Sequence, residues 1–310
     1  MNQLKVVSVI TLISLIWGYL WVTAKMGLED IPPFLFSASR LLIGATTLFL
    51  LLLAKRQKIL PNKKEWLPFF YLSLFMCVGY YALSTYGLQF VDSGLSSVLV
   101  YTMPIIISVL AHFFLNEYLT LNKVIGLTVG AIGLLFILGP TIKHLSWNDS
   151  LLGEIIILAS AFFWACASIY TKKIGQSHDK LKMTLWQLLM GGSLILIISL
   201  GSEHEAISQM TLSTSSILAL LYNGVLGTAV AFVGWNWVLG KIQASIASIS
   251  LMTVPILGLI FGWLQLDEKI TSNILIGAVC ICLGILFTSI QRKKTVKGTK
   301  RKMLLTSDER

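Results

Sequence analysis

Ten apolar stretches of about 20 residues each constrain this 310-residue sequence more than any other feature. A helix needs about 20 mainly apolar residues to cross the hydrocarbon core of a bilayer. Only 12% of the residues are charged, whereas a soluble domain carries roughly a quarter. No alternation of apolar and polar residues is sustained, as the strands of a membrane barrel would require. The sequence therefore predicts an all-α integral membrane protein of about ten transmembrane helices, roughly at residues 6–24, 34–54, 67–88, 94–115, 122–139, 153–171, 183–201, 215–239, 246–266 and 273–290.

The positions of the basic residues predict how the chain is oriented. The net charge is +10, but the Lys and Arg residues flank apolar stretches instead of forming a patch on a polar domain, so no nucleic-acid partner is expected. With the N-terminus in the cytoplasm, 20 of the 24 Lys and Arg residues fall on the cytoplasmic side and 3 on the outer side. Because cytoplasmic loops carry an excess of these residues, we expect a multi-pass protein of the cell membrane with both termini in the cytoplasm.

The sequence also contains an internal repeat. Residues 94–137 align without gaps with residues 245–288, and 13 of the 44 positions are identical. We therefore predict two five-helix repeats, a connecting loop and a basic cytoplasmic tail, at residues 1–139, 153–290, 140–152 and 291–310 respectively. Because each repeat has an odd number of helices, the second enters the membrane in the opposite direction. Inverted repeats are common in secondary transporters, which place the substrate site near the midplane where the repeats meet.

Motifs for metals, cofactors and enzymatic chemistry are absent from the sequence. The four cysteines have neither a CxxC spacing nor a histidine cluster beside them. The sequence contains no HExxH, no GxSxG, no pair of Asp within an apolar stretch and no GxxxxGK[ST]. We therefore expect no metal, no cofactor and no enzymatic activity.

Two paired motifs carry a family resemblance. The first runs from Pro104-Ile-Ile-Ile-Ser to Phe114-Leu-Asn-Glu117, and the second from Pro255-Ile-Leu-Gly-Leu to Gln265-Leu-Asp-Glu268. With Ile16-Trp17-Gly18 and Arg40, these motifs resemble the drug/metabolite transporter superfamily, in its ten-helix EamA-like branch, over residues 12–290. The family usually has Gly before each Glu, where this chain has Asn116 and Asp267. The resemblance implies export or exchange of metabolites, amino acids or drugs, without naming one.

Aromatic and polar side chains inside the predicted helices are the candidates for a solute-binding cavity: Trp17, Arg40, Tyr80, Tyr81, Tyr101, Trp164, Gln187 and Asn236. A cavity of aromatic rings with a few polar groups suits amphipathic organic solutes. Trp17 and Trp164 occupy equivalent repeat positions, which favours a shared cavity; the alternative is that the aromatic residues serve in packing. Arg40 is the one formal charge deep within an apolar stretch. It could bind a substrate carboxylate, stabilise a helix end, or extend to the outer interface.

The paired prolines and glutamates have alternative interpretations. Pro104 and Pro255 would each remove a hydrogen bond and kink a helix, either as hinges of the pathway or as static packing kinks. Glu117 and Glu268 stand at helix ends. We expect structural carboxylates that accept N–H bonds from the helix that follows, with proton transfer as the alternative.

The predicted function is a secondary transporter that moves small organic solutes by alternating access, through export or exchange. A lipid flippase or scramblase is the alternative, which would need a groove open to lipid, and an intramembrane enzyme is less favoured. The expected partners are a small-molecule solute and membrane lipids, the latter under the basic tail; no oligomeric state follows from the sequence. No carboxylate falls in the central part of a predicted helix, so transport is not expected to require a proton gradient.

Overall fold

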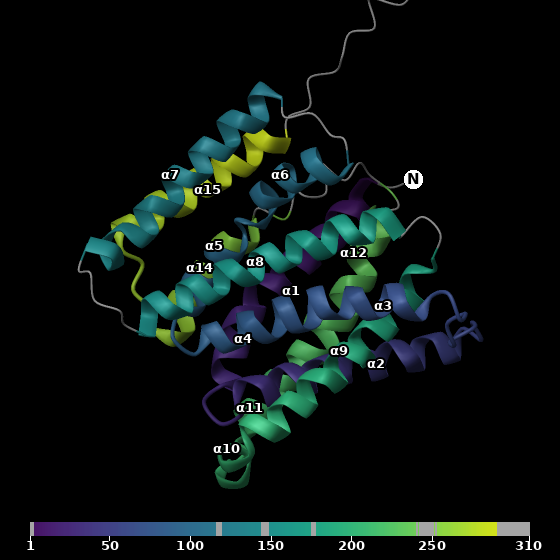
Figure 1. Cartoon of the computed structure of the whole chain (residues 1–310). Coiled ribbons are helices and arrows are strands. Elements are labelled where there is room, and N and C mark those ends of the chain that lie inside the picture. The colour runs from purple at the N-terminus through teal and green to yellow at the C-terminus, as the bar shows by residue number, and fades with distance from the viewer. Residues whose placement is uncertain are drawn as a thin grey trace, which may run out of the picture.

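The structure, a computed structural model, consists of helices that lie side by side in a bundle (Figure 1). It describes residues 3–115, 120–143, 149–174, 178–239, 241, 251 and 253–289. Every regular element among these residues is a helix. The predicted all-α membrane class is therefore confirmed.

Seven helical passes are long and apolar enough to cross a membrane. Four are single helices: α1 (Gln3–Gly27), α2 (Pro33–Ala54), α8 (Asp149–Ile174) and α9 (Lys180–Ser202). The other three passes are composite: α3 (Trp66–Ser73), η1 (Leu74–Ala82) and α4 (Leu83–Leu88); α5 (Ser93–Val100) and α6 (Met103–Leu115); α11 (Thr214–Leu221), η2 (Tyr222–Val230) and α12 (Ala231–Leu239).

Three further helices carry shorter apolar stretches: α7 (Leu121–Lys143), α14 (Thr253–Leu266) and α15 (Ser272–Ser289). Together with the seven longer passes they make the ten that the sequence predicts. The short helix α10 (His204–Gln209) lies between the seventh and eighth passes and has no buried residue.

The helix contacts made by the first half (residues 1–139) correspond to those made by the second half (residues 153–290). The second pass, α2, packs on the seventh, α9, and the fifth, α7, packs on the tenth, α15. Figure 1 shows α7 and α15 side by side, in teal and yellow. The first pass, α1, contacts the ninth, α14, just as the sixth, α8, contacts α6 of the fourth. The α1–α14 and α8–α6 contacts thus correspond to each other with the halves exchanged, and the other two contacts each join corresponding helices. This pattern fits two halves that pack alike.

The third and eighth passes each contain a nine-residue π-helical segment, η1 and η2. A π-helix forms i→i+5 backbone hydrogen bonds in place of the i→i+4 bonds of an α-helix; it is rare and is found frequently at functional sites. The two segments occupy corresponding places in the two halves. Both halves therefore carry the same local distortion near the middle of the bundle.

Large apolar side chains lie both inside the bundle and on its surface. Phe36, Leu41 and Leu188 are fully buried, whereas Phe113, Leu135 and Ile197 are more than 60% exposed. A soluble helix would place its apolar side chains on one face only. Exposed apolar faces on all passes fit a bundle whose solvent is lipid.

Candidate functional site

A continuous row of rings crosses the middle of the bundle and joins its two halves. Its members, which we call the aromatic row, are Tyr81, Tyr80, Trp164, Phe232, Trp17 and Trp235. The ring centroids of Tyr80 and Trp164 lie 4.4 Å apart, and those of Tyr80 and Tyr81 lie 4.8 Å apart. Phe232 connects the two tryptophans, with its centroid 6.5 Å from that of Trp164 and 6.0 Å from that of Trp17. All these centroid distances lie in the range that aromatic pairs prefer. The Tyr80–Trp164 and Trp17–Phe232 pairs are edge-on, and the other pairs are tilted.

The π-helical segments position three members of this row, Tyr80, Tyr81 and Trp17. Tyr80 and Tyr81 are consecutive residues of η1, so their side chains leave the helix in different directions. Tyr80 meets Trp164 of α8, and Tyr81 meets Arg40 of α2. The indole Nε1 of Trp17 donates a hydrogen bond of 3.0 Å to the carbonyl oxygen of Gly227 in η2. The backbone of η2 thus supplies the acceptor that this partly buried indole needs.

Arg40 lies at the Tyr81 end of the aromatic row. Its guanidinium carbon is 5.0 Å from the centroid of the Tyr81 ring, which is a cation–π distance. The residue is only 4% exposed, so it does not extend to the membrane interface, one of the alternatives that the sequence left open. Its Nε has no hydrogen-bond partner among the described residues.

The remaining cavity candidates lie around this row or outside the described side chains. Tyr101 is 7% exposed and follows α5, at the break in the fourth pass. Gln187 is buried in α9, where its backbone carbonyl accepts a bond from the Cys77 thiol of η1. Asn236 belongs to α12, but its side chain is outside what the structure describes. The structure therefore brings together five of the eight candidates in one connected group: Trp17, Arg40, Tyr80, Tyr81 and Trp164.

The two prolines stand at helix starts. The fourth pass breaks between α5 and α6, and Pro104 is the second residue of α6. Pro255 is the third residue of α14. First-turn N–H groups have no intrahelical acceptor, so proline removes no hydrogen bond there, contrary to our expectation from the sequence. The break at Tyr101 and Thr102 nevertheless bends the fourth pass beside the aromatic row, and a hinge role for the prolines stays a prediction.

Glu268 caps a helix of the opposite half. Its carboxylate accepts N–H bonds from Ser93 at 2.6 Å and from Gly94 at 2.8 Å, at the start of α5. From the sequence we expected the Glu268 carboxylate to accept N–H bonds from α15, the helix that follows it. At the start of α15 the acceptor is instead the hydroxyl of Thr271, which accepts a bond from the Ile274 N–H. A carboxylate at a helix N-terminus is stabilised by the free N–H groups and the helix dipole. Glu117, the repeat equivalent, lies outside the described residues.

Two more carboxylates join the halves at the same end, which we call the acidic end (Asp30, Asp92, Glu203 and Glu268). Glu203, after α9, accepts N–H bonds of 2.9 Å from Phe34 and Leu35 at the start of α2. Asp30 accepts bonds from the Ser213 N–H at 2.9 Å and the Ser216 hydroxyl at 2.7 Å. The hydrogen bonds from Ser213 and Ser216 lower the pKa of Asp30. Burial, followed by the charge of Glu268, raises the pKa of Asp92.

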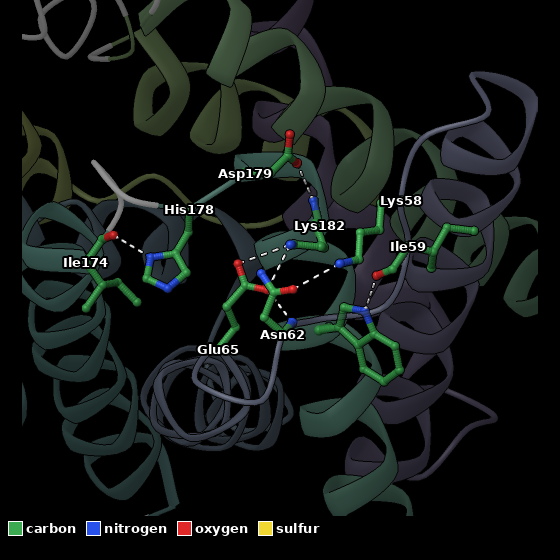
Figure 2. Close-up of polar contacts among 9 residues, drawn as sticks. Lys58, Ile59, Asn62, Glu65, Ile174, His178, Asp179 and Lys182 are labelled. Atoms are coloured by element: carbon green, nitrogen blue, oxygen red, sulfur yellow. Dashed lines mark hydrogen bonds and ion pairs between the residues drawn. The ribbon is translucent and has the colours of Figure 1, made fainter.

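A buried ion pair joins the halves at the opposite end, which we call the basic end (residues 55–65 and 178–186). Figure 2 shows the ammonium of Lys182 beside the carboxylate of Glu65, with N–O distances of 2.8 and 3.0 Å. Both residues are 7% exposed. Trp186 adds an indole bond of 2.8 Å to the carbonyl of Ile59. Burial would raise the pKa of Glu65, but its hydrogen bonds from Lys182 and from the Asn62 N–H lower it below the ordinary value.

Sequence reasoning missed Phe232 and all these polar contacts between the halves. Phe232 has no motif or repeat partner that sets it apart. The signal for Glu203 was a carboxylate directly after an apolar stretch, at the end of the bundle where α2 begins with Pro33. Among the described residues, no three His, Cys, Asp or Glu residues form a group that could hold an ion.

The profile of the EamA-like transporter family matches residues 4–139 and again residues 151–290. The chain belongs to the EamA-like transporter family. It is 45% identical over 294 residues to the uncharacterized transporter YoaV of Bacillus subtilis, covering 94% of this chain and 100% of that one. It is 27% identical to a probable amino-acid metabolite efflux pump of Escherichia coli, covering 92% of this chain and 96% of that protein.

A solved structure shows that the fold is shared. A crystal structure with 18% sequence identity covers 92% of this chain and 96% of its own, with a TM-score of 0.67. The family and the names of these relatives identify the chain as a membrane transport protein and not an enzyme. Metabolite transport is the level of function that they support.

Proposed function

We propose that this EamA-like chain is a secondary transporter that carries small organic solutes across the cell membrane by alternating access, in export or exchange. The observation that carries the proposal is the aromatic row. Three of its rings come from the first half and three from the second. A solute held among these rings contacts both halves, so movement of one half against the other changes its surroundings.

The chemistry of the row favours metabolites with an apolar part. Aromatic rings offer flat apolar faces, while the phenols of Tyr80 and Tyr81 and the charge of Arg40 offer a few polar contacts. Relatives named as amino-acid metabolite efflux pumps support solutes of this size and polarity. Amino acids and their derivatives are therefore the first solutes to test.

The matched packing of the two halves supports alternating access. A few polar contacts join the halves at each end: Glu268, Glu203 and Asp30 at the acidic end, and Glu65 with Lys182 at the basic end. Hydrogen bonds to charged groups contribute about 1.5–3 kcal/mol each. Opening either end thus requires breaking a small set of contacts, while the close packing of α7 on α15 can persist.

The test is solute flux in proteoliposomes containing the purified chain and radiolabelled L-amino acids. We expect Trp17→Ala and Trp164→Ala to reduce flux while the amount of folded protein stays near that of the wild type. Trp263→Ala is the matched control, because Trp263 is 56% exposed on α14 and outside the aromatic row. Equal flux in all three variants, or loss of folded protein that matches the loss of flux, would contradict the proposed site.

Orientation can be tested separately with single cysteines. We propose that the basic end faces the cytoplasm, since loops rich in Lys and Arg stay there. A membrane-impermeant thiol reagent added to intact cells should label a cysteine at position 204 and leave cysteines at positions 63 and 297 unlabelled. Labelling at position 297 would reverse the orientation.

One observation favours lipid movement as a second candidate function. A groove of about 580 Å³ lies between α2 and α9 near the basic end, lined mainly by apolar side chains such as Phe49, Leu185 and Leu189, with Lys58 at its edge. An acyl chain with an anionic headgroup suits such a groove. Transfer of fluorescent phosphatidylglycerol between leaflets of proteoliposomes, faster than in protein-free vesicles, would support this candidate over solute transport.

A further inference from the structure

Arg40 differs from the other cations held inside the bundle because no described residue forms an ion pair with it. Lys182, equally buried, is paired with both oxygens of Glu65. Lys25, half-buried at the end of α1, donates to the carbonyl oxygens of Leu88 at 2.7 Å and Val91 at 2.8 Å. Within the described part of the chain, Arg40 has no carboxylate partner and its Nε has no hydrogen-bond partner; its neighbour is the face of the Tyr81 ring.

Arg40 lacks the partners that usually offset the free-energy cost of burying a charge. An arginine side chain stays protonated in proteins and carries five N–H donors. A buried charge without a counter-charge or acceptors costs several kcal/mol, and a cation–π contact returns only about 2 kcal/mol. Removing this charge from water therefore needs a partner that the described residues do not supply.

We propose that the missing partner is the carboxylate of the transported solute, which binds the Arg40 guanidinium while its apolar body packs on Tyr81, Tyr80 and Trp164. The inference rests on the proposed transport function and specifies its substrate class as small organic monocarboxylates, including amino acids. Guanidinium and carboxylate form two parallel hydrogen bonds when both are removed from water. No hydrogen bond joins the hydroxyl of Tyr80 or Tyr81 to another described residue, so both phenols can also donate to the bound anion.

The charge of the site favours a carboxylate over a phosphate. A phosphate monoester carries nearly two negative charges at neutral pH, and a buried dianion would need more than one cation. Arg40 is the one cation that contacts the aromatic row among the described residues. A single carboxylate balances it.

The experiment measures ligand binding to purified wild-type protein in detergent, from the shift of the thermal midpoint with ligand concentration. The probes are benzoate and phenylacetate, compared with benzamide and phenylacetamide, which have nearly the same shape and no charge. We expect each acid to bind at least about tenfold more tightly than its amide, since hydrogen bonds to a charged pair contribute roughly 1.5–3 kcal/mol. In Arg40→Gln, this preference should disappear.

Two further variants keep the test decisive. Arg40→Lys retains the charge and protects against a failure of Arg40→Gln to fold; it should bind the acids less tightly than the wild type, because an ammonium lacks the planar fork. Lys269→Gln, at an exposed position, matches the change in net charge and should bind as the wild type does. The inference is overturned if acids and amides bind equally, if Arg40→Gln retains the preference, or if neither acid binds at 10 mM (roughly the weakest useful affinity).

Flux measurements separate this inference from the proposed function. Flux of amides with no preference for acids would keep transport and overturn the carboxylate site. Acid binding that depends on Arg40, without flux of any solute, would keep the site and overturn transport.

Discussion

Gly133 of α7 and Gly277 of α15 lie so close together that a Cβ atom added to either would be 2.7 Å from the carbonyl oxygen of the other. The contact is reciprocal, and it joins the fifth and tenth passes, one from each half. Small residues at helix interfaces let backbones approach closely in lipid, where no hydrophobic effect drives helices together. We infer that this close contact of α7 and α15 holds the two halves together.

Replacing Gly133 with Leu should therefore destabilise the bundle. The side chain would meet the backbone of α15, which cannot move as a flexible side chain can. Overpacking of this kind costs about 1–3 kcal/mol, and we expect a lower thermal midpoint in detergent and less folded protein in the membrane. Gly201→Leu is the control, because a Cβ atom there has nothing within 4 Å. Equal losses in the two variants would show that the close contact is not what matters.

The buried ion pair at the basic end gives a second prediction. Lys182→Met leaves the Glu65 carboxylate buried without its counter-ion, which costs about 3–5 kcal/mol. The double variant Glu65→Leu with Lys182→Met removes both charges and should recover most of the lost stability. The measurement is the thermal midpoint of the single variant compared with that of the double variant. A double variant as unstable as Lys182→Met would mean that the lysine acts through packing.

The same pair predicts a pH dependence of stability. Since the pKa of Glu65 is lowered in the folded state, its contribution is fully present above the ordinary value of 4.5 and is lost as the pH falls through the lowered value. We expect the midpoint difference between the wild type and Glu65→Gln to be large at pH 7 and to shrink below about pH 4. Using the difference between the two proteins removes the similar contribution of Asp30, whose pKa is also lowered. A difference that is constant with pH would contradict the ionised pair.

The fold was predictable from the sequence because its cause is local. Each pass needs only an apolar stretch long enough for the bilayer, and the repeat of residues 94–137 in 245–288 implies that the two halves pack alike. The equivalence of Trp17 and Trp164 predicted that they would share one site. In the structure both rings contact Phe232, although they do not contact each other.

The polar contacts were not predictable, because they depend on which passes become neighbours. Glu65 and Lys182 are far apart in the sequence, and each alone resembles a solvated charge of a basic loop. The pairing of α2 with α9 places Glu203 at the start of α2, and no local pattern reports that pairing. The π-helical segments were missed for a related reason. The residues of η2 contact the opposite half, where Gly227 accepts a hydrogen bond from the Trp17 indole, and the local sequence does not report such contacts.

The acidic end gives a prediction about conformational equilibrium. Glu203→Gln and Glu268→Gln weaken contacts that join the halves there, so they should shift the population toward a state open at that end. Spin labels at Gln89 and Glu205, both exposed, report the separation of the two halves. We expect a larger fraction of long distances in each variant than in the wild type. Asp149→Gln, a change of charge at the same end without a described bond between the halves, is the control. An unchanged distance distribution in both Glu variants would mean that these carboxylates stabilise helix ends and do not control opening.

Energy coupling gives the last prediction. Proton-driven carriers commonly use an intramembrane carboxylate whose charge changes as it moves between solvents, and the sequence places none in the central part of a pass. We therefore expect downhill flux of L-amino acids in proteoliposomes to continue when the pH is clamped equal on both sides. The structure also identifies the group to examine if this is wrong. Glu154, in the second turn of α8, is only 3% exposed, and its Oε2 has no hydrogen-bond partner among the described residues. If flux stops without a pH gradient and returns when one is imposed, Glu154→Gln should abolish that dependence, whereas Glu205→Gln, at an exposed position, should not.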